Sequence, residues 1–149
     1  QSITVPVYQG SLHKTPVKNI RIDYSKRWKQ VHLRAISSYY RAAPFFEFYF
    51  EEIEKIILAN NEFLIDLNTR LTEAILKIIG IQISIGYTGT FTPIGTVDYD
   101  FRYKITPKRQ SESVAKGYTQ VFNEDSGFTY GLSILDLVFN MGPESVHYL

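Results

Sequence analysis

Three amphipathic helical patterns follow one another between Asp23 and Gly80. In each of them apolar residues recur three and four positions apart, which predicts a helix that buries one face. We expect the first helix to begin after Ser25, the second to open at Pro44, and the third to end at Gly80 in a left-handed turn. A chain with this order of elements has to bury the three apolar faces in a common core.

Short stretches outside these helices are rich in the apolar and β-branched residues typical of strands. The expected strands cover residues 3–7, 17–23, 81–85 and 99–105. A further short helix is expected over residues 134–140, capped by Ser133, with Asp136 three residues further on as in a capping box. The sequence thus predicts an α+β fold. A small mixed or antiparallel sheet packs against the three central helices and the short C-terminal helix, with the strand order left open.

Length and composition indicate one domain over residues 1–149. This length is sufficient to bury a real core, and the shares of apolar (44%) and charged (21%) residues are ordinary for a globular protein. The chain starts at Gln1 and enters a strand-like stretch at once. We therefore expect an N-terminal segment to be missing from these residues.

The charge balance and the lack of cysteine exclude several classes of partner and site. Sixteen Lys and Arg against fifteen Asp and Glu give a net charge of +1, which argues against nucleic acid as a partner. Without cysteine there is no disulfide, thiolate-bound metal or thiol nucleophile, which fits the cytoplasm, where we place the protein. No apolar run in the sequence approaches the roughly 20 residues that cross a bilayer, so no membrane partner is expected.

Sequence motifs for metals and cofactors are missing. His13, His32 and His147 lie far apart, and none has the spacing of paired metal ligands. The sequence contains no phosphate-binding loop, no dinucleotide-binding glycine motif and no nucleophile elbow. We predict no metal site and no cofactor.

His32 is the one histidine on the apolar face of a predicted helix, with Trp28 and Ile36 one turn away on either side. Partial burial keeps such a ring neutral near pH 7, as a general base requires. The alternative is a core histidine whose ring bonds a backbone carbonyl, and because helical stripes mostly pack, the sequence alone favours this alternative.

A cationic stretch follows the late strand pattern. Arg102-Tyr103-Lys104 and Lys108-Arg109 place guanidinium, ammonium and phenol groups close together, and arginine binds phosphate or carboxylate in a bidentate fork. The alternative is a solvated strand face and turn. The aromatic share of 15% likewise fits either a ring-lined cleft or a tyrosine-rich core.

The sequence resembles the WbqC-like protein family, most closely its Bacteroidetes-type branch, over nearly the whole length. The motifs that carry the resemblance are Ile3-Thr4-Val5-Pro6-Val7, Ile22-Asp23-Tyr24 with Trp28, His32-Leu33-Arg34-Ala35-Ile36, Tyr40 with Ala43-Pro44-Phe45-Phe46, Phe63-Leu64 with Asp66-Leu67-Asn68, Tyr118-Thr119-Gln120-Val121-Phe122, and the stretch from Leu132 to Asn140 with Gly142-Pro143. The closing stretch is the most specific of these. An N-terminal segment with a His-Gln-Pro signature, found in many members, is absent here.

Membership implies a role in bacterial surface-polysaccharide (O-antigen) biosynthesis, with transfer of an acyl or aminoacyl group, such as glycyl, to an amino sugar. The positions that match family motifs are His32, Tyr40, Asp66, Asn68, Gln120 and Asn140. On this basis we assign His32 and Asp66 to catalysis. The remaining four motif positions, together with Arg102, Tyr103, Lys108 and Arg109 from the cationic stretch, are assigned to substrate binding.

Two functional hypotheses follow. In the first, the protein is a cytoplasmic transferase whose partner is a small molecule, a nucleotide-linked or amino sugar. In the second, it is a non-catalytic module of the same pathway that binds a glycan or a protein through its aromatic residues. Phe48, which lies outside the apolar stripe of its helix, motivates the second hypothesis. The oligomeric state is left open.

Overall fold

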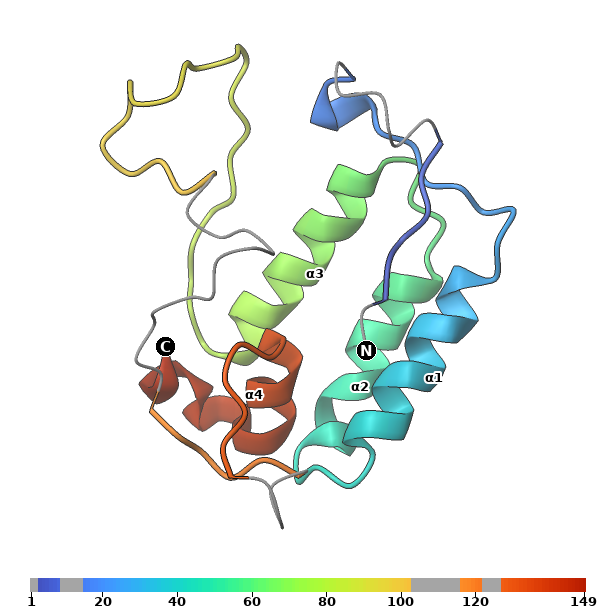
Figure 1. The fold of residues 1–149 in the computed structure, drawn as a ribbon, viewed down its shortest axis with the longest axis vertical. Helices are drawn as coiled ribbons and strands as arrows, with labels where there is room; N and C mark the ends of the chain where they lie inside the picture. Colours follow the sequence, from blue (N-terminus) through green and yellow to red (C-terminus); the bar gives the residue numbers. More distant parts are fainter. Residues whose placement is uncertain (1–2, 9–14, 103–115, 122–126) are drawn as a thin grey trace.

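A computed structural model of the chain (Figure 1) describes residues 3–8, 15–102, 116–121 and 127–149. Its elements, in chain order, are the 3₁₀ helix η1 (Val17–Asn19), the α-helices α1 (Trp28–Tyr40), α2 (Phe46–Leu58), α3 (Leu64–Ile78) and α4 (Ile134–Met141), and the 3₁₀ helix η2 (Gly142–Tyr148). The three central helices and the short C-terminal helix expected from the sequence are thus confirmed. Within the described ranges, none of the helices has both the length and the apolar character needed to cross a bilayer.

Helix α2 lies at the centre of the helical packing, in contact with α1, α3 and α4. Its buried residues Ile53 and Ile57 meet Ile36 of α1 and Leu67 of α3 in one hydrophobic core. The repeats at three and four positions in the sequence place these residues on the inner faces. Burial of this shared core is the main source of stability for the fold.

The beginning of α1 is fixed by a side chain rather than by a cap of its own. The residue before the helix, Arg27, makes no side-chain cap, and Ser25, the expected cap, instead donates its backbone N–H to Asp23. Lys29 Nζ donates to the carbonyl oxygens of Leu58 (2.7 Å) and Ala59 (3.1 Å) at the end of α2. This ammonium group satisfies carbonyls that the end of α2 leaves open and ties the first turn of α1 to them.

Helix α4 is joined to the central helices through Phe139, whose side chain is fully buried. Its ring lies 5.2 Å from the ring of Phe46 and 5.4 Å from that of Tyr40. The carbonyl oxygen of Phe139 accepts a 2.9 Å hydrogen bond from the backbone N–H of Phe45. Packing and backbone hydrogen bonding therefore hold α4 at the junction between α1 and α2.

The N-terminal part of the chain forms extended connections without a sheet. The described residues contain two isolated β-bridges, Val7 with Ile22 and Arg21 with Phe63. Further backbone bonds join Ile22 to Glu62 and Asp23 to Pro6. Residues 20–23 therefore lie between residues 6–8 and 62–64, and each side is held by only a few hydrogen bonds.

The predicted α+β fold with a small sheet is wrong for the described residues. Residues 17–19 form η1 instead of a strand, and residues 81–85 are extended without a ladder partner, with Ile83 65% exposed. Tyr99 and Phe101 are exposed as well, while residues 103–105 lie outside the described ranges. A strand needs a neighbour to pair with and a core to cover, and its sequence pattern specifies neither.

The cap of α4 is confirmed in part. Ser133 Oγ accepts from the backbone N–H of Leu135 at 3.3 Å, as an N-cap should. Asp136 does not complete a capping box, because its carboxylate accepts from Tyr118 and Gln120 in the interior. Asp136, in the first turn of α4, thus stabilises the packing of residues 116–121 on α4 and does not cap the helix.

Gly142, which follows α4, is at a position where a side chain meets two obstacles. Its φ of 55° lies in the left-handed region, and a Cβ placed there would be 2.5 Å from the ring of Phe45. Gly80 has a φ of 78° with no atom within 4 Å of the corresponding position. Gly80 thus has the backbone strain without the steric overlap, and Gly142 has both. Comparing an alanine substitution at each position separates the two costs.

We expect Gly142→Ala to lower the free energy of unfolding by about 3 kcal/mol, because strain and overlap with Phe45 add. Gly80→Ala is the matched control and should cost about 1 kcal/mol through strain alone. Urea denaturation of both variants measures the difference. Equal losses would show that the contact with Phe45 carries no cost.

Candidate functional site

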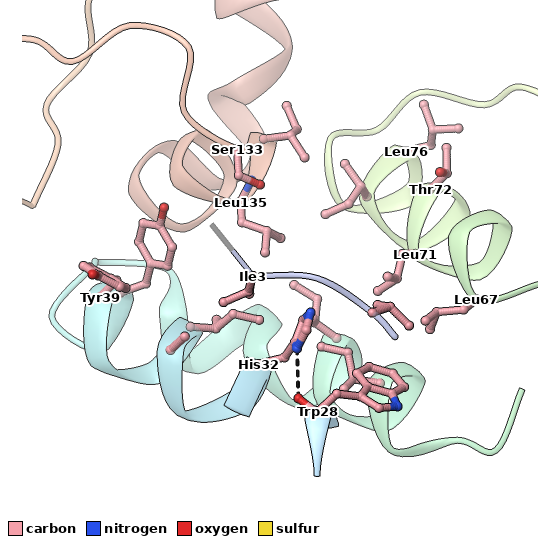
Figure 2. A pocket seen from close by; sticks show the side chains of 18 of the residues that line it. Ile3, Trp28, His32, Tyr39, Leu67, Leu71, Thr72, Leu76, Ser133 and Leu135 are labelled. Atoms are coloured by element: carbon pink, nitrogen blue, oxygen red, sulfur yellow. Dashed lines mark hydrogen bonds between the residues drawn. The ribbon is translucent and has the colours of Figure 1, made fainter. Parts of the chain in front are cut away.

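A cavity of about 580 Å³ lies among α1, α2, α3 and the beginning of α4 (Figure 2). Side chains from each of these helices line it, among them Trp28, His32, Ile53, Leu71 and Leu135, and Ile3 of the N-terminal segment joins them. Its volume is typical of small-molecule binding sites. The core of the helical fold thus contains a space of the size that a ligand needs.

His32 stands in the wall of this cavity. Its Nδ1 lies 2.8 Å from the carbonyl oxygen of Trp28, one turn earlier in α1. The imidazole meets the Trp28 ring edge-on, with 5.2 Å between the ring centroids. Both contacts follow from the spacing of four residues, which places the two side chains on one face of the helix.

The bond to Trp28 determines the tautomer of His32. A carbonyl oxygen only accepts hydrogen bonds, so Nδ1 carries the hydrogen, and in the neutral ring Nε2 holds a lone pair. Figure 2 shows Nε2 turned away from Trp28 toward the cavity, and among the described residues no group hydrogen-bonds to it. The bond to a backbone carbonyl is the one that the core-histidine interpretation predicts, and the same ring turns Nε2 toward a cavity.

Tyr40 lines the same cavity from the last turn of α1. Burial, together with the negative charges of Asp136 and Tyr39, raises the pKa of Tyr40 to about 12. The hydroxyl is therefore protonated at neutral pH. In this state Tyr40 can donate a hydrogen bond to a ligand.

A buried carboxylate network adjoins the Tyr40 end of the cavity. Asp136, fully buried in α4, accepts from Tyr118 Oη at 2.7 Å and from Gln120 Nε2 at 2.8 Å, both through Oδ2. Gln120 also exchanges two hydrogen bonds with the backbone of Thr129, at 3.0 and 2.9 Å. Asn140 Nδ2 donates to the carbonyl oxygen of Asp136 at 2.7 Å. The network ties residues 116–121 and 127–130 to α4.

This network raises the pKa of Tyr118, first through burial and then through its bond to Asp136. Gln120 and Asn140 are substrate ligands in the sequence-based prediction, which does not group them with Asp136 and Tyr118. One sequence signal was available: Asp136 is the only charged residue of α4, and the residues on either side of it in the sequence, Leu135 and Leu137, are apolar. A carboxylate in such a position is buried and needs hydrogen-bond donors.

The other predicted site residues are dispersed. Asp66 and Asn68 are exposed on α3, on either side of the buried Leu67, and neither lines the cavity. Arg102 is bonded to Asp100 through Nε (2.8 Å) and to the carbonyl oxygen of Thr92 (2.8 Å). This pairing lowers the pKa of Asp100 to about 2.

Tyr103, Lys108 and Arg109 lie outside the described residues. Of the predicted residues that the structure describes, His32 and Tyr40 meet in the cavity, and Gln120 and Asn140 meet in the adjoining network. In the part of the chain that is described, no three His, Asp or Glu side chains come together as metal ligands would.

The sequence profile of the WbqC-like protein family matches residues 1–114. This range contains α1, α2 and α3, and with them His32 and Tyr40. The stretch from Leu132 to Pro143, which the sequence analysis counted as the most specific part of the resemblance, lies beyond the match. No curated protein and no solved structure matches the chain.

We expect Asp136→Ala to lower the free energy of unfolding by about 3 kcal/mol, because the buried Gln120 Nε2 and the partly buried Tyr118 Oη lose their acceptor. Asp136→Asn retains a carbonyl oxygen for these donors and should cost about half as much. Urea denaturation compares the two variants. A loss below about 1 kcal/mol for the alanine variant would contradict a structural role for the network.

Tyr40 should make stability depend on pH in the alkaline range. Its pKa is raised in the folded state above the ordinary value of 10.0, so the unfolded chain releases the proton first. The contribution of this group is complete below pH 10 and is lost as the pH rises toward about 12. We expect Tyr40→Phe to flatten this decline, whereas Tyr99→Phe, at an exposed position, should leave it unchanged. The measurement is urea denaturation at a series of pH values across this window; identical slopes in both variants would contradict the assignment.

Proposed function

The chain belongs to the WbqC-like protein family, and from this membership we propose that it is an enzyme of bacterial surface-polysaccharide (O-antigen) biosynthesis. In this proposal it transfers an acyl or aminoacyl group to the amine of a nucleotide-linked or free amino sugar. The pathway and the type of transfer come from the family resemblance. The observation that supports an enzymatic role is the Nε2 lone pair of His32, held toward a cavity of ligand size.

In the proposed step the sugar amine attacks the carbonyl carbon of an activated ester or thioester. A carbon–nitrogen bond forms, and the proton leaving the nitrogen passes to Nε2 of His32. The carbon–oxygen or carbon–sulfur bond then breaks, and the leaving group takes the proton back from Nε2. The products are an amide and a free alcohol or thiol, and His32 returns to its starting state.

The surroundings of His32 suit this step. The Trp28 carbonyl oxygen holds the ring in one orientation and stabilises the positive charge that forms when Nε2 is protonated. Tyr40 lies eight residues further along α1, about 12 Å along the helix axis. It therefore acts on a different part of the substrate, where its neutral hydroxyl donates a hydrogen bond or its ring stacks on the sugar.

For the phosphates of a nucleotide-linked sugar, we propose the cationic side chains of Arg102, Lys108 and Arg109, together with Tyr103, which follows Arg102 in the sequence. A phosphate at Arg102 has to compete with Asp100, which Arg102 binds in the structure. Asp66 and Asn68 are exposed on α3, so a role in the reaction requires a substrate that extends beyond the cavity.

A non-catalytic glycan- or protein-binding module is the second candidate. Phe48, near the beginning of α2, is 75% exposed, and its ring lies 6.1 Å from that of Phe45. Exposed aromatic rings of this kind stack on sugars or insert into partner proteins. Calorimetry that detects binding of a glycan or protein, combined with no turnover of amino sugars, would favour this function.

His32→Gln should lower the rate of acyl transfer by about 10²- to 10⁴-fold, because glutamine cannot take up the proton. The matched control is His147→Gln, at an exposed position in η2, which should keep full activity. Mass spectrometry of the amide product, with an amino sugar as acceptor, measures both rates. A folded His32→Gln protein with full activity would remove His32 from the mechanism.

A further inference from the structure

The wall of the cavity beside His32 consists almost entirely of hydrocarbon. Ile53 and Ile57 of α2 and Leu71 and Ile75 of α3 face it, opposite Ile36 of α1. Among the described residues that line it, none is Asp, Glu, Lys or Arg. The polar side chains there belong to Trp28, through its indole N–H, and to His32, Tyr39, Tyr40, Thr72 and Ser133.

This lining disfavours a charged occupant. A glycyl or other aminoacyl group carries an ammonium at neutral pH, and an unpaired ammonium is costly to bury. The cavity wall offers no carboxylate to pair with it. An aliphatic chain gains free energy in the same space in proportion to the apolar area that leaves water.

The size of the cavity points in the same direction. A water molecule occupies about 30 Å³ in the liquid, so about 580 Å³ exceeds the volume of a two-carbon group several-fold. An acetyl or glycyl group would leave most of the apolar wall without contacts. A chain of several carbons covers it.

From these observations we propose that the cavity binds the hydrocarbon chain of the acyl donor, and that the group transferred is an uncharged aliphatic acyl chain rather than glycyl. The chain lies against α2 and α3, and the carbonyl carbon remains near Nε2 of His32 in the wall. This inference rests on the proposed acyl transfer. It specifies the class of donor that the same site accepts.

An aliphatic chain can come from a soluble thioester or from a membrane lipid. We assign the soluble thioester, because an amine displaces a thiol from a thioester more readily than an alcohol from the oxygen esters of a lipid. His32 faces the cavity, and the described residues that line it offer no other group to activate an ester. Phosphatidylcholine vesicles supply the membrane lipid in the test, and uptake of acyl chains from them is measured for comparison.

The first experiment measures binding by displacement of the neutral dye N-phenyl-1-naphthylamine. Octanamide should displace the dye and glycinamide should not. Ala35 lines the cavity, so Ala35→Phe fills part of it and should weaken octanamide binding at least tenfold. Ala42→Phe is the same substitution at an exposed position and should have no effect. Should the phenylalanine variant fail to fold, Ala35→Leu makes the same test with a smaller side chain.

The second experiment measures transfer from octanoyl and glycyl thioesters of N-acetylcysteamine to an amino sugar. Octanoyl transfer should be faster by about 10- to 200-fold in kcat/KM. Glycyl transfer that equals or exceeds octanoyl transfer would overturn this inference and leave the proposed transferase intact. Octanamide binding that Ala35→Phe abolishes, without transfer of either group, would support the ligand class and overturn the proposed function. Uptake of chains from the vesicles without binding of octanamide would overturn the choice of a soluble donor.

Discussion

The burial of Phe139 between α1 and α2 is the interaction on which the site depends. Its ring contacts Tyr40 and Phe46, and its carbonyl oxygen accepts from the backbone of Phe45. Because these contacts dock α4, the first turn of α4 covers one side of the cavity. The same docking brings Asp136 near Tyr40 and provides the carboxylate that holds residues 116–121. The docking of α4 therefore closes one side of the cavity and positions the network.

The helices were predictable from the sequence because their signals are local. Apolar spacing placed α1, α2 and α3, Gly80 adopted the expected positive φ, and Ser133 capped α4. The sheet was not predictable, because pairing depends on residues far away in the chain. Ile22 has the composition of a strand residue, yet it makes one isolated bridge, and its side chain is buried in the helical core instead.

In the candidate site, too, contacts within one helix were predictable from the sequence, and contacts between distant segments were not. Aromatic and apolar neighbours one turn away identified His32, since helix geometry fixes such contacts. The joining of Tyr118, Gln120 and Asp136 depends on how α4 docks, and spacing of sixteen to eighteen residues in sequence gives no sign of it. Asp66 and Asn68 were predicted from the family resemblance, which gives positions in the sequence but not how exposed a side chain is. Both side chains are exposed on α3, and neither lines the cavity.

The tie between Lys29 and the end of α2 has a consequence for how heat would affect the orientation of His32. Helix α1 begins without a side-chain cap, so its first turn is held by this ammonium group and by the burial of Trp28 in the core. That turn contains Trp28, whose carbonyl oxygen orients the imidazole of His32. Fraying of a single turn would release the ring while the remaining helices stay packed. The orientation of the ring would then be lost at a lower temperature than the packing of the core.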